Sequence, residues 1–314
     1  MIEIEGPNSS PATELSTIAS GSIAKPPQAT PLLTVGLLEK ALLERFPRAD
    51  AESWDRMGLL VGDPSEPLEG VCVALDPTLE AIRAAAELGA NVLLTHHPAY
   101  LNPPEVLSPS RLTASAAGVN VWEAVRSGVA LMNFHTALDV SDDARELFLN
   151  LLKLDWKRML VPSDADPGKG YGYLCTIRSC DVPFTLGRMA ARCTSVFGRV
   201  PRVWGDMDEK VASIVFANGS AGNVVEACVA EKVDCLICGE VRYHAALDAA
   251  QAGLGIIEVG HDASELPLTA ILARAAIRTG VAPDIVTVLD QGRNWGLPDS
   301  TRLSNSAVEP DFGS

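Results

Sequence analysis

The sequence predicts an α/β protein with two three-layer domains, and three observations lead to this prediction. Short apolar, β-branched runs alternate with segments of helical periodicity over most of the chain, which is typical of sheets covered by helices. The chain has 314 residues, enough for two domains at about 150 residues each. A segment rich in proline and glycine, residues 162–172, separates two stretches of this pattern and predicts a linker.

The first domain is predicted over residues 31–160, and its clearest part is a strand–helix–strand unit. Residues 71–75 form a short apolar strand, residues 78–88 a helix that begins with threonine, and residues 91–95 the next strand. Two strands joined by a helix are expected to be parallel. A further strand is predicted over residues 129–134.

The second domain is predicted over residues 161–297, with its last helix and strand able to pack on the first domain. Its expected strands lie near residues 173–177, 211–217, 234–237, 255–259 and 285–289, and its expected helices near 186–196, 223–231, 243–252 and 264–279. Residues 1–30 and 298–314 show no periodicity, so we predict disordered tails there.

Charge and composition exclude several classes of protein. The chain has 25 Lys and Arg against 40 Asp and Glu, a net charge of −15, which argues against binding to nucleic acid or to an anionic membrane surface. No apolar run is long enough for a transmembrane helix, and the first residues do not resemble a secretory signal. Seven cysteines are an odd, low count, so we predict no disulfide framework and a cytoplasmic protein.

Four of the five histidines directly follow predicted strands, where ligands bind in open α/β sheets. They are His96, His97, His135 and His261. Two carboxylates, Asp139 and Glu265, each lie four residues after a histidine, which places the pair on one face if the segment is helical. Imidazole and carboxylate groups are ligands of first-row transition metals, so this pattern favours a metal site over a set of isolated surface histidines.

Adjacent histidines on an extended chain point in different directions, so His96 and His97 could each serve a different metal ion. Two cations held roughly 3.5–4 Å apart need neutral donors, carboxylates and often a bridging group, and they lower the pKa of a bound water. The residues therefore indicate hydrolysis as one chemistry open to such a site.

Six segments occur in an order that resembles the Nif-three-like family of dinuclear metal-centre proteins, also called GTP cyclohydrolase 1 type 2 homologues. The segments are Trp54–Gly62 (WDRMGLLVG), Leu75–Thr78 (LDPT), Thr95–Pro98 (THHP), His135–Asp139 (HTALD), Gly239–His244 (GEVRYH) and Gly260–Glu265 (GHDASE). The resemblance covers roughly residues 33–290. The histidine–histidine–proline, HTALD and GHDASE segments together make it specific.

The resemblance implies two similar α/β domains with a dinuclear metal site in the cleft between them. It implies as ligands His96, His97, Asp139, His261 and Glu265, with Glu265 as a candidate bridge. It places His135 and His244 near the metals as the catalytic candidates, either as residues that surround the ligands or as proton carriers. It also implies two divalent ions (zinc, iron or manganese) and a homohexamer.

The chain departs from the family pattern at a few positions. Arg56 replaces an expected asparagine, Asp262 replaces a usual aromatic residue, and the helix after Asp139 lacks a glycine-rich run. These departures concern substrate contacts more than metal ligation.

Three other features have simpler structural explanations. Cys235 and Cys238 have zinc-knuckle spacing, but they lie on a predicted buried strand where positions three apart face opposite sides. Residues 218–222 could cradle a phosphate, yet they lack the lysine of a P-loop, so a plain turn is favoured. Asp76 could serve the site or cap a turn.

The leading hypothesis is therefore a dinuclear metal-dependent hydrolase, in which metal-bound hydroxide attacks a nucleotide-like or other small substrate. The family name suggests a GTP cyclohydrolase-type ring opening, although no residue pattern identifies a guanine pocket. The alternative is a non-catalytic metal-binding scaffold or regulator that acts through protein partners. An open coordination position would favour the enzyme, because structural sites are closed by protein ligands.

Overall fold

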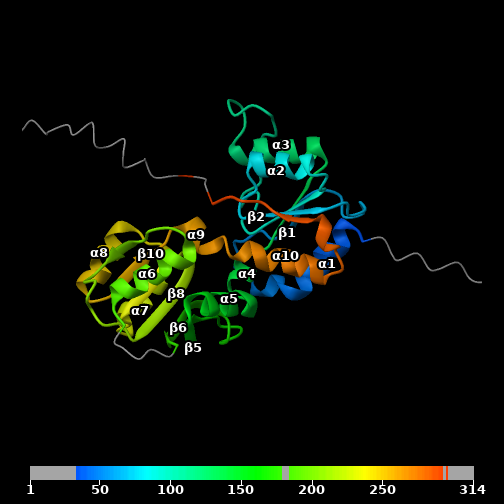
Figure 1. Cartoon of the computed structure of the whole chain (residues 1–314). Coiled ribbons are helices and arrows are strands. Elements are labelled where there is room, and N and C mark those ends of the chain that lie inside the picture. Colours follow the sequence, from blue (N-terminus) through cyan, green and yellow to red (C-terminus); the bar gives the residue numbers. More distant parts are fainter. Residues whose placement is uncertain (1–32, 179–183, 293–294, 296–314) are drawn as a thin grey trace, which may run out of the picture. The chain divides into compact units, whose positions relative to one another are not determined.

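The computed structural model describes residues 33–178, 184–292 and 295, and two β-sheets covered by helices occur in them (Figure 1). The first sheet has the strand order β1-β4-β3-β2-β11. Its strands are β1 (Gly58–Val61), β2 (Val71–Ala74), β3 (Val92–Thr95), β4 (Ala130–Asn133) and β11 (Val286–Val288). β11, β2, β3 and β4 are parallel, which confirms the predicted strand–helix–strand unit, and β1 pairs antiparallel with β4.

Helices lie on both faces of the first sheet. α2 (Leu79–Glu87) and α3 (Ala116–Ser127) cover one face, and α1 (Val35–Arg45) and α10 (Leu268–Arg278) lie on the other side (Figure 1). Alternate strand residues serve the two layers. Cys72 and Leu93 pack in the cluster that contains Ile82 of α2, whereas Val73 and Leu94 belong to the cluster that contains α10. The central strands are therefore apolar on both faces, as is usual for parallel strands.

The second sheet has the strand order β5-β6-β8-β9-β10-β7. Its strands are β5 (Leu154–Pro162), β6 (Gly170–Ile177), β7 (Arg202–Trp204), β8 (Ser213–Ser220), β9 (Cys235–Glu240) and β10 (Gly255–Glu258). α6 (Leu186–Phe197) packs in the cluster on one face, and α7 (Val224–Ala230) and α8 (Tyr243–Gln251) pack on the other. β8, β9 and β10 are parallel, so their carboxyl ends meet at one edge of the sheet.

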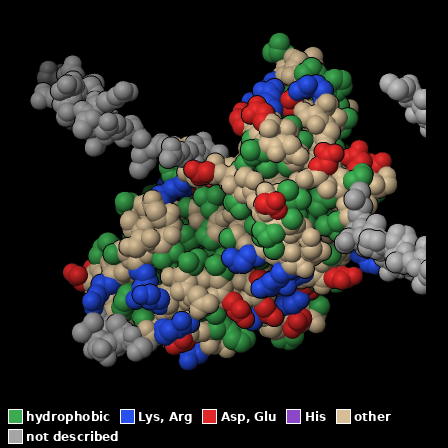
Figure 2. Space-filling model, turned by 45° about the vertical axis from the view of Figure 1, so that its right-hand side comes forward, with side chains coloured by type: hydrophobic (Ala, Val, Ile, Leu, Met, Phe, Trp, Pro, Cys, Tyr) green, Lys and Arg blue, Asp and Glu red, His purple; other side chains and the backbone are tan. Residues whose placement is uncertain are grey.

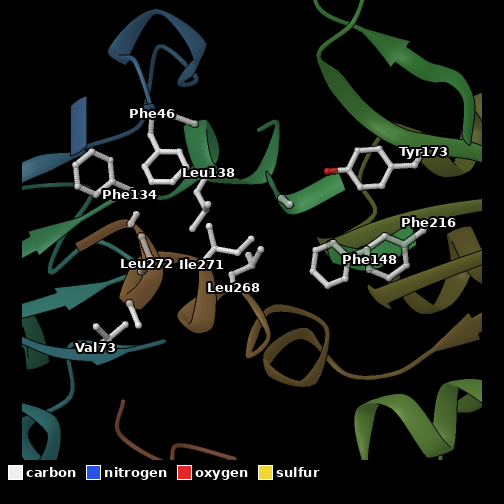
Figure 3. Close-up of a cluster of buried hydrophobic side chains, with 14 of the residues drawn as sticks. Phe46, Val73, Phe134, Leu138, Phe148, Tyr173, Phe216, Leu268, Ile271 and Leu272 are labelled. Atoms are coloured by element: carbon white, nitrogen blue, oxygen red, sulfur yellow. The ribbon is translucent and has the colours of Figure 1, made fainter. Parts of the chain in front are cut away.

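A single cluster of buried side chains includes residues of both sheets (Figure 3). Phe148 of α5 (Asp142–Leu152) packs against Phe216 of β8, with ring centroids 4.4 Å apart. Leu138, Leu268 and Ile271 are buried in the same cluster and lie close together in Figure 3. The short helix that carries Asp139 is therefore anchored in the apolar core.

Several predicted elements differ from those observed. The helix expected over residues 264–279 is two helices, α9 (His261–Glu265) and α10, with Pro267 between them, because proline cannot donate the hydrogen bond that continues a helix. Residues 218–220 continue β8, where we expected a turn. Residues 163–169 join β5 to β6, which are antiparallel neighbours, so the predicted linker forms a hairpin connection.

The sequence patterns did not reveal α1, β1, β5 or β7. β5 is an edge strand with four successive exposed residues, so it lacks the alternation that marks a half-buried strand. The predicted tails, residues 1–30 and 298–314, lie outside the described residues. In the described part of the chain no helix has the length and apolar character needed to cross a membrane.

Acidic and basic side chains are interspersed on the face of the molecule drawn in Figure 2. The negative net charge of −15 is therefore not concentrated in one patch on that face. Charge of either sign spread in this way is typical of a solvated surface.

Candidate metal centre

The candidate histidine ligands lie just after the ends of strands, and the fold brings them close together. His96 and His97 follow β3, and His135 follows its parallel neighbour β4. His261 begins α9, shortly after β10 of the other sheet. Backbone hydrogen bonds from the amides of His96 and His97 to the carbonyls of Ala74 and Leu75 hold this segment beside β2.

Six of the predicted residues come together as three overlapping groups that could hold metal ions. Each group has ligand atoms within 4.8 Å of one another. The groups are His96, Asp139 and Glu265; His97, His261 and Glu265; and His96, His97 and His135. Glu265 belongs to two groups and is nearly buried, at 3% exposure, which fits the predicted bridging position.

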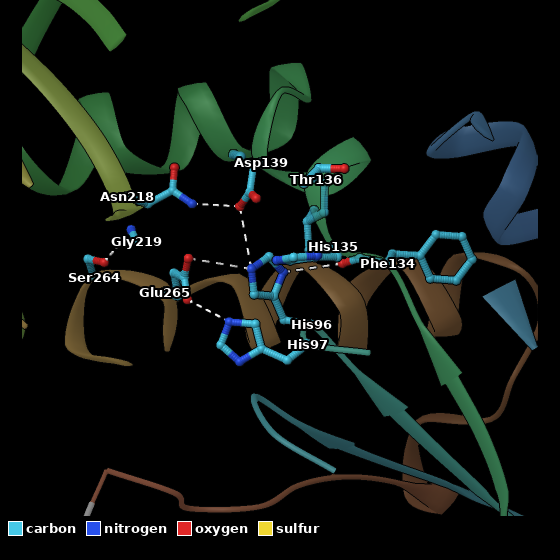
Figure 4. Close-up of polar contacts among 12 residues, drawn as sticks. His96, His97, Phe134, His135, Thr136, Asp139, Asn218, Gly219, Ser264 and Glu265 are labelled. Atoms are coloured by element: carbon cyan, nitrogen blue, oxygen red, sulfur yellow. Dashed lines mark hydrogen bonds and ion pairs between the residues drawn. The ribbon is translucent and has the colours of Figure 1, made fainter. Parts of the chain in front are cut away.

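Glu265 faces three imidazoles of the centre, and its contacts with His96 and His97 are drawn in Figure 4. Its Oε2 is 3.0 Å from Nε2 of His97 and 3.1 Å from Nε2 of His261. Its Oε1 is 3.7 Å from Nε2 of His96, and that nitrogen is 3.4 Å from Oδ1 of Asp139. The Nε2 atoms of three imidazoles thus converge on two carboxylates.

The opposite ring nitrogen of every imidazole in the centre has an acceptor. Nδ1 of His97 lies 2.7 Å from Asp76, Nδ1 of His135 3.0 Å from Asp55, and Nδ1 of His261 3.1 Å from Glu240. Nδ1 of His96 lies 3.2 Å from the carbonyl oxygen of Phe134. A proton on Nδ1 leaves the lone pair of Nε2 available, which is the usual arrangement of metal-binding histidines.

His96 provides the test of whether a cation fits here. A carbonyl oxygen can only accept a hydrogen bond, so Nδ1 of His96 must donate to Phe134, and neutral His96 carries a lone pair on Nε2. That Nε2 atom is buried without a hydrogen-bond partner and faces the carboxylates of Asp139 and Glu265. A buried lone pair facing two carboxylates is strongly unfavourable unless a cation lies between them. The donor set of this centre therefore fits a metal ion.

The surroundings shift the ionisation of the two buried carboxylates in opposite directions. Burial raises the pKa of Asp139, and the negative charge of Glu265 adds to this effect. Burial would also raise the pKa of Glu265, but contacts with His261, His96 and His97 outweigh burial and hold its pKa well below the usual range. The centre thus keeps at least one carboxylate ionised at neutral pH.

The neighbouring carboxylates raise the pKa values of two imidazoles, His97 and His261. Burial lowers the pKa of His97, but Asp76 and Glu265 raise it to about 10. Contact with Glu265 raises the pKa of His261 to about 9, because this contact and a smaller effect of Glu240 outweigh the lowering by burial. Without a metal, the centre therefore stabilises positive charge on its imidazoles, and a bound cation would satisfy the same carboxylates.

Four further polar residues surround the centre, and the sequence analysis gave a possible site role only to Asp76. Asp55, Asp76 and Glu240 hold imidazoles, and Asn218 donates a hydrogen bond from Nδ2 to Oδ1 of Asp139 at 2.5 Å. Asp76 follows β2 and Glu240 ends β9, so the rule that pointed to the histidines also marks these two carboxylates. Asn218 directly follows the strand predicted over residues 211–217, so the same rule marks it, whereas Asp55 follows no predicted strand.

His244 is not among the residues that the structure brings together. It lies exposed on α8, and its ring packs against Tyr243 with centroids 5.2 Å apart. Its position gives no support to the predicted role as a proton carrier. Cys235 and Cys238 are both fully buried and belong to different clusters on the two faces of the sheet, which confirms that they are core residues.

A pocket of about 870 Å³ opens onto the centre, and His135, Asp139, His261 and Glu265 are among its lining residues. Trp54 also lines it, with 53% of its surface exposed and its ring edge against His135. The acidic residues of the lining are Asp50, Glu52, Asp139, Asp164, Asp166 and Glu265. Lys169 is the only lysine or arginine among the described lining residues, and it pairs with Asp50.

Fold and site together define an α/β protein with a His/Asp/Glu centre suited to metal ions. The chain belongs to the Duf34/NIF3 (NGG1p interacting factor 3) family, whose model matches residues 33–282. This result confirms the resemblance that the six sequence segments indicated.

Named relatives and solved structures agree with this assignment. A GTP cyclohydrolase 1 type 2 homolog of Streptomyces coelicolor is 31% identical over 237 residues, which are 72% of this chain and 80% of the relative. One of Clostridium acetobutylicum is 27% identical over 74% of this chain and 86% of its own length. A Staphylococcus aureus protein has a TM-score of 0.74 at 21% identity and covers 85% of this chain and 99% of its own. A Bacillus cereus protein related to NIF3 has a TM-score of 0.74 at 17% identity, over 85% of this chain and 100% of its own. The structural matches show that the fold is shared.

Proposed function

We propose that this protein is a hydrolase that depends on two divalent transition-metal ions. Asp139 and His96 would hold one ion, His97 and His261 the other, and Glu265 would contribute to both. When bound, such ions lower the pKa of a coordinated water and so provide a nucleophile near neutral pH. The observation that carries the proposal is the buried, unpartnered Nε2 of His96, which faces two carboxylates.

His135 is our candidate for moving a proton during hydrolysis. It lines the pocket, and its Nδ1 lies 3.0 Å from Asp55. Burial would raise the pKa of Asp55, but hydrogen bonds from His135 and Thr136 lower it to about 2, so this carboxylate stays ionised at neutral pH. Asp55 therefore fixes the proton on Nδ1 of His135 and leaves Nε2 able to accept or return a proton.

The pocket supports an enzyme more than a closed structural metal site. Four residues of the centre reach a cavity large enough for a small molecule, so protein atoms do not enclose it. Structural sites, in contrast, are usually closed by their protein ligands. A non-catalytic scaffold remains the outcome to be expected if metal binds and no substrate is turned over.

The charge of the pocket limits the classes of substrate that can bind. Its lining is predominantly acidic and offers one lysine, already paired with Asp50. Asp139 and Glu265 would face the metal ions, so the like charge that a polyphosphate would meet is that of the exposed carboxylates Glu52, Asp164 and Asp166, which disfavours binding. We therefore propose that the substrate is a nucleobase-like or nucleoside-like molecule whose ring is opened by hydrolysis, in preference to a nucleoside triphosphate.

Elemental analysis followed by a substrate screen tests the proposal. The purified protein should bind close to two zinc, iron or manganese ions per chain, and it should hydrolyse a member of a nucleobase, nucleoside and nucleotide panel. A chelator should abolish turnover, and His135→Asn should reduce turnover more than it reduces metal content. Absence of bound metal after incubation with each of the three ions would contradict the proposal.

We also propose that the chain assembles as a homohexamer in the cytoplasm. The hexamer is supported by the family resemblance, and the cytoplasm by the odd, low cysteine count of seven. Light scattering at micromolar concentration should report about six times the mass of one chain. A stable monomer would contradict the hexamer.

A further inference from the structure

A buried glutamine beyond the family match holds the turn after β2. Gln291 lies past residue 282, where the family match ends, and 8% of its surface is exposed. Its Oε1 accepts hydrogen bonds from the backbone amides of Leu75 and Asp76, both at 2.8 Å. Its Nε2 donates to the carbonyl oxygen of Asp76 at 2.9 Å. One side chain therefore makes three hydrogen bonds to a two-residue turn.

This turn needs such a partner because β2 ends at Ala74. The amides of Leu75 and Asp76 lie beyond the strand, and leaving buried amides without acceptors is costly. The preceding chain brings Gln291 into place, since β11 pairs parallel with β2 and the amide of Leu289 donates to the carbonyl of Val73 at 2.8 Å. The C-terminal strand thus delivers the glutamine to the end of its neighbour.

The turn at Leu75 and Asp76 holds the imidazole of His97, which belongs to the metal centre. Oδ1 of Asp76 lies 2.7 Å from Nδ1 of His97, and the amide of His97 donates to the carbonyl of Leu75 at 2.9 Å. Nε2 of His97 then lies 3.0 Å from Glu265. The contacts run without a break from Gln291 through the turn to the centre.

We propose that Gln291 is a positioning residue for the metal centre. It fixes the backbone on either side of Asp76, so that the carboxylate orients the imidazole of His97 and presents Nε2 to the metal. The inference rests on the metal centre of the proposed function and assigns a role to a segment that the family match does not include.

Zinc affinity of the full-length protein, measured by competition with a chromophoric chelator, tests the role. Gln291→Met keeps a similar volume but removes all three hydrogen bonds. We expect at least one Zn²⁺ dissociation constant to rise on the order of 10–100-fold, the usual effect of losing an outer-shell partner. An unchanged set of zinc affinities in a folded variant would overturn the inference.

Asn91 offers a matched control. It is also 8% exposed, and its side chain also holds a turn, accepting from the amide of Glu69 and donating to the carbonyl of Pro67, each at 2.8 Å. That turn precedes β2, at the end of the strand away from the centre. Asn91→Leu should lower the melting temperature of the metal-free protein as Gln291→Met does, but leave the zinc affinities unchanged. If it weakens zinc binding to the same degree, the effect is general destabilisation and the inference fails.

A double-mutant cycle separates positioning through Asp76 from a merely structural role. If Gln291 acts through this carboxylate, Gln291→Met should weaken zinc binding less than twofold further in an Asp76→Ala background. Additive losses would overturn the route. If Gln291→Met does not fold, Gln291→Asn serves instead, because its side chain is one methylene shorter and its amide lies further from the turn. This variant should still weaken zinc binding several-fold, and wild-type affinity would refute the inference. Failure of the wild-type protein to bind zinc would instead refute the metal centre itself.

Discussion

Gly219 of β8 lies so close to Glu265 that an added methyl group would displace the proposed bridging carboxylate. A Cβ atom at this position would be 2.3 Å from Oε1 of Glu265 and 3.5 Å from Nε2 of His261. The residue also has φ +59°, a left-handed conformation that glycine adopts without strain. Gly219→Ala should therefore affect both the backbone and the metal centre, and the two effects can be separated.

The displacement can be estimated from the contact distances. Favourable contacts between non-bonded heavy atoms begin near 3.5 Å, so the carboxylate must move by about 1 Å to accommodate the methyl group. Metal–ligand distances tolerate deviations of only about 0.2 Å, so a shift of this size should remove Glu265 as a ligand. The left-handed backbone adds about 1–2 kcal/mol of strain for any residue with a Cβ atom.

Gly222→Ala is the matched control for the strain. Gly222 lies three residues further along, has φ +46°, and its added Cβ would have no neighbour within 4 Å. Both variants should lose similar stability when urea unfolding is measured on the metal-free protein. Only Gly219→Ala should lose zinc affinity, by at least tenfold in a competition titration. Equal zinc binding by Gly219→Ala and wild type would refute our placement of Glu265 in the centre.

Three further predictions concern the ligand, a structural carboxylate and the substrate. Glu265→Gln should keep the circular dichroism spectrum of the wild type but lose at least one metal ion on elemental analysis, because an amide bridges two cations far less well than a carboxylate; full metal content would count against the bridge. Burial alone would raise the pKa of Asp234, but hydrogen bonds from Ser213 and Ala212 hold it below the usual value. Its stabilisation is therefore present above the pKa of the unfolded chain and lost as the pH falls through the folded pKa. Urea unfolding of Asp234→Asn should show a loss of about 1 kcal/mol at pH 7 that shrinks towards pH 3, and a loss independent of pH would contradict this assignment. Raising the ionic strength should improve the binding of GTP to the metal-loaded protein and leave guanosine unaffected, since salt screens the exposed carboxylates Glu52, Asp164 and Asp166 of the pocket; the reverse order in calorimetry would argue against a substrate of low charge.

Much of the fold could be predicted because its central strands and helices carry strong local signals. β2 and β3 are continuous apolar runs, and the side chain of Thr78 caps the helix between them, accepting from the amide of Ala81 at 3.1 Å. Elements with weaker patterns were missed. β5 lies at a sheet edge with four exposed residues in succession, so its pairing with β6 depends on contacts that no local pattern records.

The sequence by itself determined the residue types of the metal centre and their place after strands. His96, His97, His135 and His261 all lie where parallel strands end, and the i, i+4 spacing of His261 and Glu265 places them on one short helix, α9. These features are local, so they can be read along the chain.

Only the tertiary structure decided which groups meet. Asp55, Asp76 and Glu240 hold imidazoles from residues 80, 21 and 21 positions away, and Gln291 reaches Asp76 across 215 positions. His244, in contrast, lies on the exposed face of α8, away from the groups that could hold metal. Hydrogen bonds act over about 3 Å, whereas sequence separation says nothing of distance once strands from both ends of the chain pair in one sheet.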